Sequence, residues 1–118
     1  MSERHWWRRA FVKGAYPLAS LVDSAGFRQR TRVDLHFLTR ALRLRPGVRL
    51  LDICCGVGRH SLPLAKAGLD VTGLDVSPVY LAEARRRAKK TGLRLRLVRG
   101  DMRRANFAAE FDAAVNLW

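Results

Sequence analysis

Residues Leu51 to Ser61 read LDICCGVGRHS and contain the turn on which the fold prediction depends. The short apolar run 48–54 predicts a buried strand, and residues 61–67 predict a helix that ends at Gly68. Gly56 and Gly58 let the backbone turn sharply and approach a ligand closely. The first N–H groups of the following helix carry positive partial charge. The stretch therefore predicts a ligand-binding turn between a strand and a helix.

Strand-like and helix-like segments alternate through the rest of the chain after residue 47. We expect a strand at 70–75, a helix from Ser77-Pro78 to about residue 90, a strand at 93–98, a loop with one helical turn at 99–110 and a strand at 112–118. Such alternation predicts a parallel sheet with right-handed crossovers. The expected fold class is α/β, with half of a doubly wound, Rossmann-like parallel sheet.

The part of the chain before Pro46-Gly47 predicts a helical leader rather than strands. A first helix is expected to end at Tyr16-Pro17, since the residue before a proline avoids the α region. Residues 24–26 predict a loop, and a second helix is expected over 29–44. Its apolar positions at helical spacing predict a buried face formed by Val33, Phe37 and Ala41, with Leu38 and Leu42 beside them.

The carboxylate of Asp75 lies 19 residues after Gly56, at the end of the second predicted strand. A carboxylate there can accept hydrogen bonds from both hydroxyls of a ribose, so the spacing predicts a nucleoside site. A dinucleotide site is the competing interpretation. It is weakened by Ser61, which stands where the dinucleotide pattern has Gly or Ala, and by Asp52, which would repel a diphosphate and suits an ammonium group instead.

The four segments at the predicted strand ends resemble the ordered motifs of class I S-adenosylmethionine (SAM)-dependent methyltransferases. They are the stretches 51–61, 71–77 (VTGLDVS), 98–103 (VRGDMR) and 111–118 (FDAAVNLW). The leader also resembles a bacterial subgroup with an aromatic-rich helix and an Arg-Thr segment, here Arg30-Thr31. The resemblance implies a helical leader or lid at 1–46 and a SAM-binding Rossmann-like half domain at 47–118.

The family's roles place the SAM cofactor around the glycine turn. Asp52 would hold the amino group of the methionine moiety, and Gly56 and Gly58 would let the backbone pass under the cofactor. Asp75 would bind the ribose hydroxyls, and Val76 would lie against the adenine.

Further family roles fall on the later motifs and on the leader. Asp101 would accept from the adenine amino group, and the N–H of Met102 would meet a ring nitrogen. Asn116 would lie near the methyl group, while Tyr16 and Arg30 would close over the methionine end, with Arg30 pairing with its carboxylate.

Other reactive residues of the first motif have less specific roles. Cys54 belongs to the cofactor-binding set by its place in the motif, although filling small buried volumes is the simpler role for Cys54 and Cys55. His60 is expected to pack or cap at the helix start rather than act as a base. No metal site is assigned, because the two cysteines are adjacent and would point to opposite faces of a strand. No catalytic residue is assigned, because methyl transfer from SAM depends mostly on positioning.

The composition limits the possible partners. The 118 residues carry 23 Lys+Arg against 10 Asp+Glu, a formal net charge of +13, and 19 of the 23 cations are Arg. The cations are dispersed, so a composition effect is favoured over nucleic-acid binding, with a basic RNA-binding or RNA-modifying domain kept as an alternative.

No apolar run is long enough to cross a membrane. Two adjacent cysteines make a poor disulfide, which predicts a reduced, cytosolic chain.

The sequence departs from the family's pattern after the fourth strand. The family's sheet has seven strands in the order 3-2-1-4-5-7-6, and the chain is expected to supply the first four. Residues 113–118 would then form an open apolar edge that invites self-association. We therefore expect a truncated methyltransferase that lacks much of the acceptor site, with an unidentified acceptor; the alternative is a SAM-binding module without transferase activity.

Overall fold

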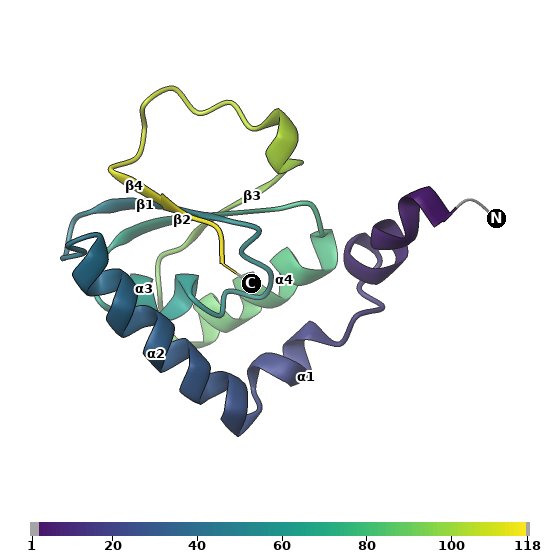
Figure 1. Cartoon of the computed structure of the whole chain (residues 1–118), viewed down its shortest axis with the longest axis horizontal. Helices are drawn as coiled ribbons and strands as arrows, with labels where there is room; N and C mark the ends of the chain where they lie inside the picture. The colour runs from purple at the N-terminus through teal and green to yellow at the C-terminus, as the bar shows by residue number, and fades with distance from the viewer. Residues whose placement is uncertain (1–2, 118) are drawn as a thin grey trace.

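The computed structural model describes residues 3–117 and contains a four-stranded parallel sheet with helices packed on it (Figure 1). The strands are β1 (Arg49–Ile53), β2 (Asp70–Asp75), β3 (Arg96–Arg99) and β4 (Ala113–Val115). The α-helices are α1 (Leu18–Val22), α2 (Ala25–Ala41), α3 (Ser61–Lys66) and α4 (Pro78–Lys90), and short helical turns are η1 (Glu3–His5), η2 (Arg8–Val12) and η3 (Met102–Arg104). The Rossmann-like α/β fold with a helical leader is confirmed.

The strand order is β3-β2-β1-β4, as the resemblance implied. The connections from β1 to β2 and from β2 to β3 run in the same direction across the sheet, so right-handed crossovers place α3 and α4 on the same face. The connection from β3 to β4 runs the other way and crosses the opposite face as a loop with η3 (Figure 1). Within residues 3–117 the helices thus cover one face of the sheet, whereas a doubly wound sheet has helices on both.

The main core lies between the sheet and this helical layer. Its buried members come from α2, α3, the segments that follow these two helices, and strands β1, β2 and β4: Leu38, Leu44, Leu50, Leu64, Leu69, Val71 and Val115. Leu50 and Val71 face each other in the parallel register of β1 and β2 and are almost fully buried. The hydrophobic contacts of these side chains fix the helices on the sheet.

Helix α4 begins as its sequence predicts. The hydroxyl of Ser77 accepts a hydrogen bond from the N–H of Tyr80 at 3.2 Å, and Pro78 occupies the first turn, where its missing N–H costs nothing. Because α4 begins here, Val76, the residue after β2, lies at the edge of the sheet where all four strands end.

The leader differs from its predicted helices. Ser24 caps α2 by accepting from the N–H of Phe27 at 3.3 Å, so Ala25 and Gly26 belong to the helix and not to a loop. The first predicted helix is divided between η1 and the π-helical turn η2, and Pro17 precedes a further short helix, α1, that the sequence analysis did not predict.

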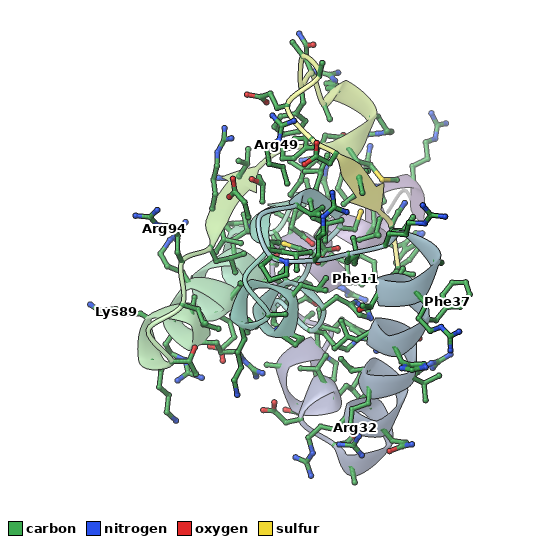
Figure 2. The ribbon with its side chains drawn as sticks, turned by 90° about the vertical axis from the view of Figure 1, so that its left-hand side faces the viewer. Phe11, Arg32, Phe37, Arg49, Lys89 and Arg94 are labelled. Atoms are coloured by element: carbon green, nitrogen blue, oxygen red, sulfur yellow. The ribbon has the colours of Figure 1, made fainter. Side chains whose placement is uncertain are left out.

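The predicted buried face of α2 is wrong. Val33 and Phe37 are 59% and 67% exposed, and Ala41 and Leu42 are exposed as well, while Leu38 is buried. Figure 2 shows the ring of Phe37 pointing outward from the helix. The inward face instead contains Thr31 and Asp34 along with its apolar residues, and these polar side chains concealed its periodicity.

Among residues 3–117, no helix is both long enough and apolar enough to cross a membrane.

Candidate cofactor site

Two adjoining hollows lie at the edge of the sheet where the strands end. The first has a volume of about 300 Å³ and the second about 400 Å³. Both are lined by Phe11, Cys54, Asp75 and Val76, so they form one continuous space. The first hollow is completed by Trp7, Leu74, Gly100, Asp101, Met102 and Arg103. The second is completed by Tyr16, Leu18, Phe27, Gly56, Arg59, Tyr80, Asn116 and Leu117.

Asp75 lies where the two hollows meet and holds the glycine turn in place. Its Oδ2 accepts the N–H of Gly56 at 2.8 Å, and its Oδ1 accepts the N–H of Ser77 at 2.9 Å. Gly56 has a φ of +58°, which a residue with a side chain adopts with strain. The 19-residue spacing seen in the sequence is therefore a direct backbone-to-carboxylate contact, and the second lone pair of each oxygen is left for a ligand hydroxyl.

Asp52 is buried on the helical side of β1, with a side chain that lines neither hollow. The hydroxyl of Ser61 donates a hydrogen bond to its Oδ2 at 2.6 Å. Burial raises the pKa of Asp52 to about 6, and the hydrogen bond from Ser61 only partly opposes this. Gly58, with a φ of +90°, lies in the same turn without lining a hollow.

Asp101 and Met102 form part of the wall of the first hollow. The Asp101 carboxylate accepts from the side chain and the backbone N–H of Arg103, and these bonds lower its pKa to about 2. Met102 is half exposed, and its sulfur lies 3.4 Å from the sulfur of Cys54.

The two cysteines have opposite environments. Cys54 has a φ of +59° and is exposed in both hollows, while Cys55 is buried under the turn. The expectation that both thiols fill buried volumes is wrong for Cys54, because its left-handed backbone ends the strand and directs its side chain outward.

The residues predicted to lie near the methyl group and the methionine end are placed differently from one another. Tyr16 and Asn116 line the second hollow, but Arg30 is exposed and does not line it. The guanidinium that does line this hollow belongs to Arg59, to which the sequence analysis gave no role.

Arg59 is part of a partly buried polar cluster that joins α2 to the start of α3. Its Nη1 donates to Thr31 Oγ1 at 3.1 Å and to Asp34 Oδ2 at 3.3 Å, and its guanidinium lies 5.4 Å from the centre of the Phe27 ring. The ring nitrogen Nε2 of His60 lies 2.9 Å from the same Asp34 oxygen. The signal for this cluster was Asp34, the one acid in a helix with four arginines.

His60 is buried at the position before α3, in keeping with a packing role, and makes no side-chain cap. Burial lowers its pKa, although the hydrogen bond with Asp34 partly opposes this.

Tyr80 of α4 also contacts the leader and holds it over the hollows. The Tyr80 hydroxyl donates to the carbonyl oxygens of Tyr16 at 2.8 Å and Ala10 at 3.2 Å. These bonds hold the segment containing Phe11 and Tyr16 over the second hollow. Within residues 3–117, no group of three His, Cys, Asp or Glu side chains has a metal-binding arrangement.

Residues 50–118, more than half of the chain, match the family model described as a methyltransferase domain. The chain belongs to this methyltransferase family. The expected class, a SAM-dependent methyltransferase of α/β fold, is confirmed at the level of the family.

Curated relatives of this methyltransferase act on different acceptors. The chain is 34% identical to ribosomal protein L11 methyltransferase of Thermus thermophilus, over 94% of this chain and 42% of the relative. It is 44% identical to a 23S rRNA (uracil(1939)-C(5))-methyltransferase of Shewanella sp. (strain MR-4), over 75% of this chain and 21% of the relative. The chain thus spans less than half of either relative.

Solved methyltransferase structures share the fold and hold the cofactor. Magnesium protoporphyrin IX methyltransferase from Synechocystis PCC 6803 with bound S-adenosylhomocysteine (SAH) superposes with a TM-score of 0.65 at 27% identity, over 77% of this chain and 42% of that one. A SAM-dependent methyltransferase from Geobacter sulfurreducens in complex with SAH gives a TM-score of 0.62 at 32% identity, over 70% and 34%. SAM is therefore the cofactor of structures that share this fold.

Proposed function

We propose that the two hollows of this chain bind SAM, and that the chain forms the cofactor-binding part of a methyltransferase. The observation that carries the proposal is Asp75, whose carboxylate is fixed by the N–H groups of Gly56 and Ser77 where the two hollows meet. A carboxylate fixed in this way suits the hydroxyls of a ribose. The ribose would then separate an adenine in the first hollow from a methionine moiety in the second.

The walls of the hollows support this orientation. Val76, Asp101 and Met102 give the first hollow an apolar surface with one acceptor, which fits an adenine and its amino group. Asp101 is already held by Arg103, so an adenine amino group would share that carboxylate. Tyr16, Arg59 and Asn116 give the second hollow polar groups for the methionine end.

Arg59 is a better candidate than Arg30 for the methionine carboxylate. Its guanidinium lines the second hollow and is held by Asp34 and Thr31, whereas Arg30 is exposed outside it. A guanidinium held in place loses less freedom when it binds a carboxylate. Asp52 would act on the ammonium group through its field or through a bridging water, because it lines neither hollow.

When bound, SAM supplies an electrophilic methyl group, and the chain's residues supply its position. Displacement at a sulfonium methyl requires alignment more than proton transfer, so binding and orientation are the main work of these side chains. We assign no general base. The acceptor is unassigned, and a module that binds SAM without transferring the methyl group is the second form of the proposal.

Calorimetric titration of the purified chain with SAH tests the proposal. We expect saturable binding that is lost in Asp75→Ala, which removes the ribose acceptor and releases two backbone N–H groups. Asp70→Ala is the matched control, since it removes an exposed carboxylate from the other end of the same strand. Titration with NAD tests the dinucleotide alternative. No SAH binding by a chain with a folded circular dichroism spectrum would refute the proposal, and preferential NAD binding would favour the alternative.

A further inference from the structure

A third hollow, about 410 Å³ in volume, adjoins the first and is lined mainly by arginines. We call it the basic hollow, and its lining consists of Trp7, Arg8, Val12, Val76, Arg99, Gly100, Asp101, Arg103 and Arg104. The four arginines come from η2, the end of β3 and η3. The fold thus brings Arg8 of the leader to the three arginines of the stretch 99–104.

The charges in the basic hollow are not balanced. Arg103 is neutralised by Asp101, the one carboxylate in the lining. Arg8, Arg99 and Arg104 make no ion pair with any residue in 3–117. Three exposed guanidiniums that share one concave surface repel one another, and a multivalent anion relieves that repulsion.

One aromatic side chain lines the basic hollow, and the residue before it in the chain is an exposed tryptophan. Trp7 lies in its wall, with the Arg8 guanidinium 5.1 Å from the ring centre. The neighbouring Trp6 is 63% exposed. Proteins bind single-stranded nucleic acids by combining a cationic groove for the backbone with exposed aromatic rings on which bases stack. Trp6 lies outside the lining of the basic hollow and provides such a ring next to Arg8 and Trp7 in the chain.

We propose that the basic hollow binds the phosphate backbone of a single-stranded nucleic acid, with a base stacked on Trp6. A strand is favoured over a small phosphate compound because the three unpaired arginines are exposed and offer no enclosed set of donors. The basic hollow shares part of its wall with the first hollow, but its three unpaired arginines lie outside the lining of both cofactor hollows, so this site goes beyond the cofactor site. It also places three of the 23 cations of the chain on one concave surface.

The test is binding of a fluorescein-labelled oligouridylate of about ten nucleotides, followed by anisotropy over about 50 to 200 mM salt. The variant Arg8→Gln/Arg99→Gln/Arg104→Gln removes the three unpaired cations and keeps Arg103, which holds Asp101. The matched control, Arg85→Gln/Lys89→Gln/Lys90→Gln, makes the same charge change on exposed residues of α4. Figure 2 shows Lys89 extending away from the body of the molecule.

For the hollow variant we expect at least a tenfold loss of affinity and a salt slope reduced by about 2, or roughly 0.7 for each lost phosphate contact. The control variant is expected to keep most of its affinity. Equal losses in both variants would overturn the proposal, because binding would then reflect net charge alone. Retained affinity in the hollow variant would overturn it as well.

Trp6→Ala distinguishes a strand from phosphate groups in general. We expect it to weaken oligouridylate about tenfold, the scale of one lost stacking contact, and to leave binding of inorganic polyphosphate of matched charge unchanged. An equal effect on both ligands, or on neither, would refute the nucleic-acid assignment. None of these measurements uses SAM, so failure here and failure of the proposed cofactor site are distinguishable, and circular dichroism of each variant checks folding.

Discussion

At the scale of single residues, burial governs the charge of Asp52. With a pKa raised to about 6, the buried carboxylate is partly protonated near neutral pH. The pKa of Asp52 is higher in the folded chain than in the unfolded chain. Its contribution to stability is therefore present below the pKa of the unfolded chain and is lost as pH rises through about 6. Under the proposed function, an ammonium group bound near Asp52 would compensate for that loss and couple cofactor binding to the ionisation of Asp52.

We predict that SAH binds more weakly as pH falls below about 6, with affinity decreasing roughly tenfold for each pH unit. Asp52→Asn is expected to bind weakly at all pH values and to lose this pH dependence. Calorimetry between pH 5 and 8 measures both effects. Asp112→Asn serves as the control, because that carboxylate is exposed and has a pKa near 2. An unchanged pH dependence in Asp52→Asn would show that another group is responsible.

At the scale of elements, the attachment of α2 to the turn before α3 depends on polar contacts as well as on Leu38. Asp34 accepts from Arg59 and lies within hydrogen-bond distance of His60. The side chains of Arg59 and His60 are 8% and 5% exposed, so neither can replace Asp34 by water at little cost.

We predict that Asp34→Ala lowers the free energy of unfolding by about 2 kcal/mol, because it removes the one carboxylate that the buried side chains of Arg59 and His60 both contact. Asp23→Ala is the matched control: its carboxylate also joins the leader to the core, through Arg87, but is 64% exposed. That change is expected to cost at most about 0.5 kcal/mol. Urea denaturation monitored by circular dichroism compares them, and similar losses in the two variants would contradict the role given to Asp34.

The sheet elements could be predicted from the sequence because each has a local signal. The strand 70–75 and the helix that begins at Ser77-Pro78 have the predicted bounds, and Asp75 lies where its spacing placed it. The leader could not be predicted as well, since its inward face uses Thr31 and Asp34 where periodicity expects apolar residues. The role proposed for Arg59 needed the fold, because only the contact with α2 shows where its guanidinium lies.

The assigned roles of the cofactor-site residues stay predictions. The structure brings Tyr16, Cys54, Gly56, Asp75, Val76, Asp101, Met102 and Asn116 to the two hollows. It leaves Asp52, Gly58 and Arg30 outside the lining. The side chain of Asp52 faces the helical layer, a distinction that the motif alone does not contain.

At the scale of the whole molecule, the open edge of the sheet and the net charge have opposing effects. Within the described residues, β4 pairs only with β1, so its other edge has unpaired backbone groups. Edges of this kind favour pairing with a second copy, whereas a formal charge of +13 on each copy opposes it.

We predict that self-association through β4 rises with salt, since salt screens the repulsion between copies. Sedimentation velocity at about 0.05 and 0.5 M salt is expected to show a dimer only at the higher concentration. Ala114→Lys, on an exposed residue of β4, should suppress it, while Ala108→Lys adds the same charge on the loop before β4 and should not. A dimer that both variants lose equally would not be formed through this edge.

The left-handed backbone at Cys54 makes one of two adjacent thiols chemically addressable. Cys55 is buried and its pKa is raised by burial, so alkylating reagents reach Cys54 alone. The pKa of Cys54 is also raised, chiefly by burial, so labelling proceeds faster as pH increases. Because its sulfur borders both hollows, the rate of maleimide labelling reports whether they are filled. Labelling of Cys54 can therefore be used to follow occupancy of the two hollows, without an engineered cysteine.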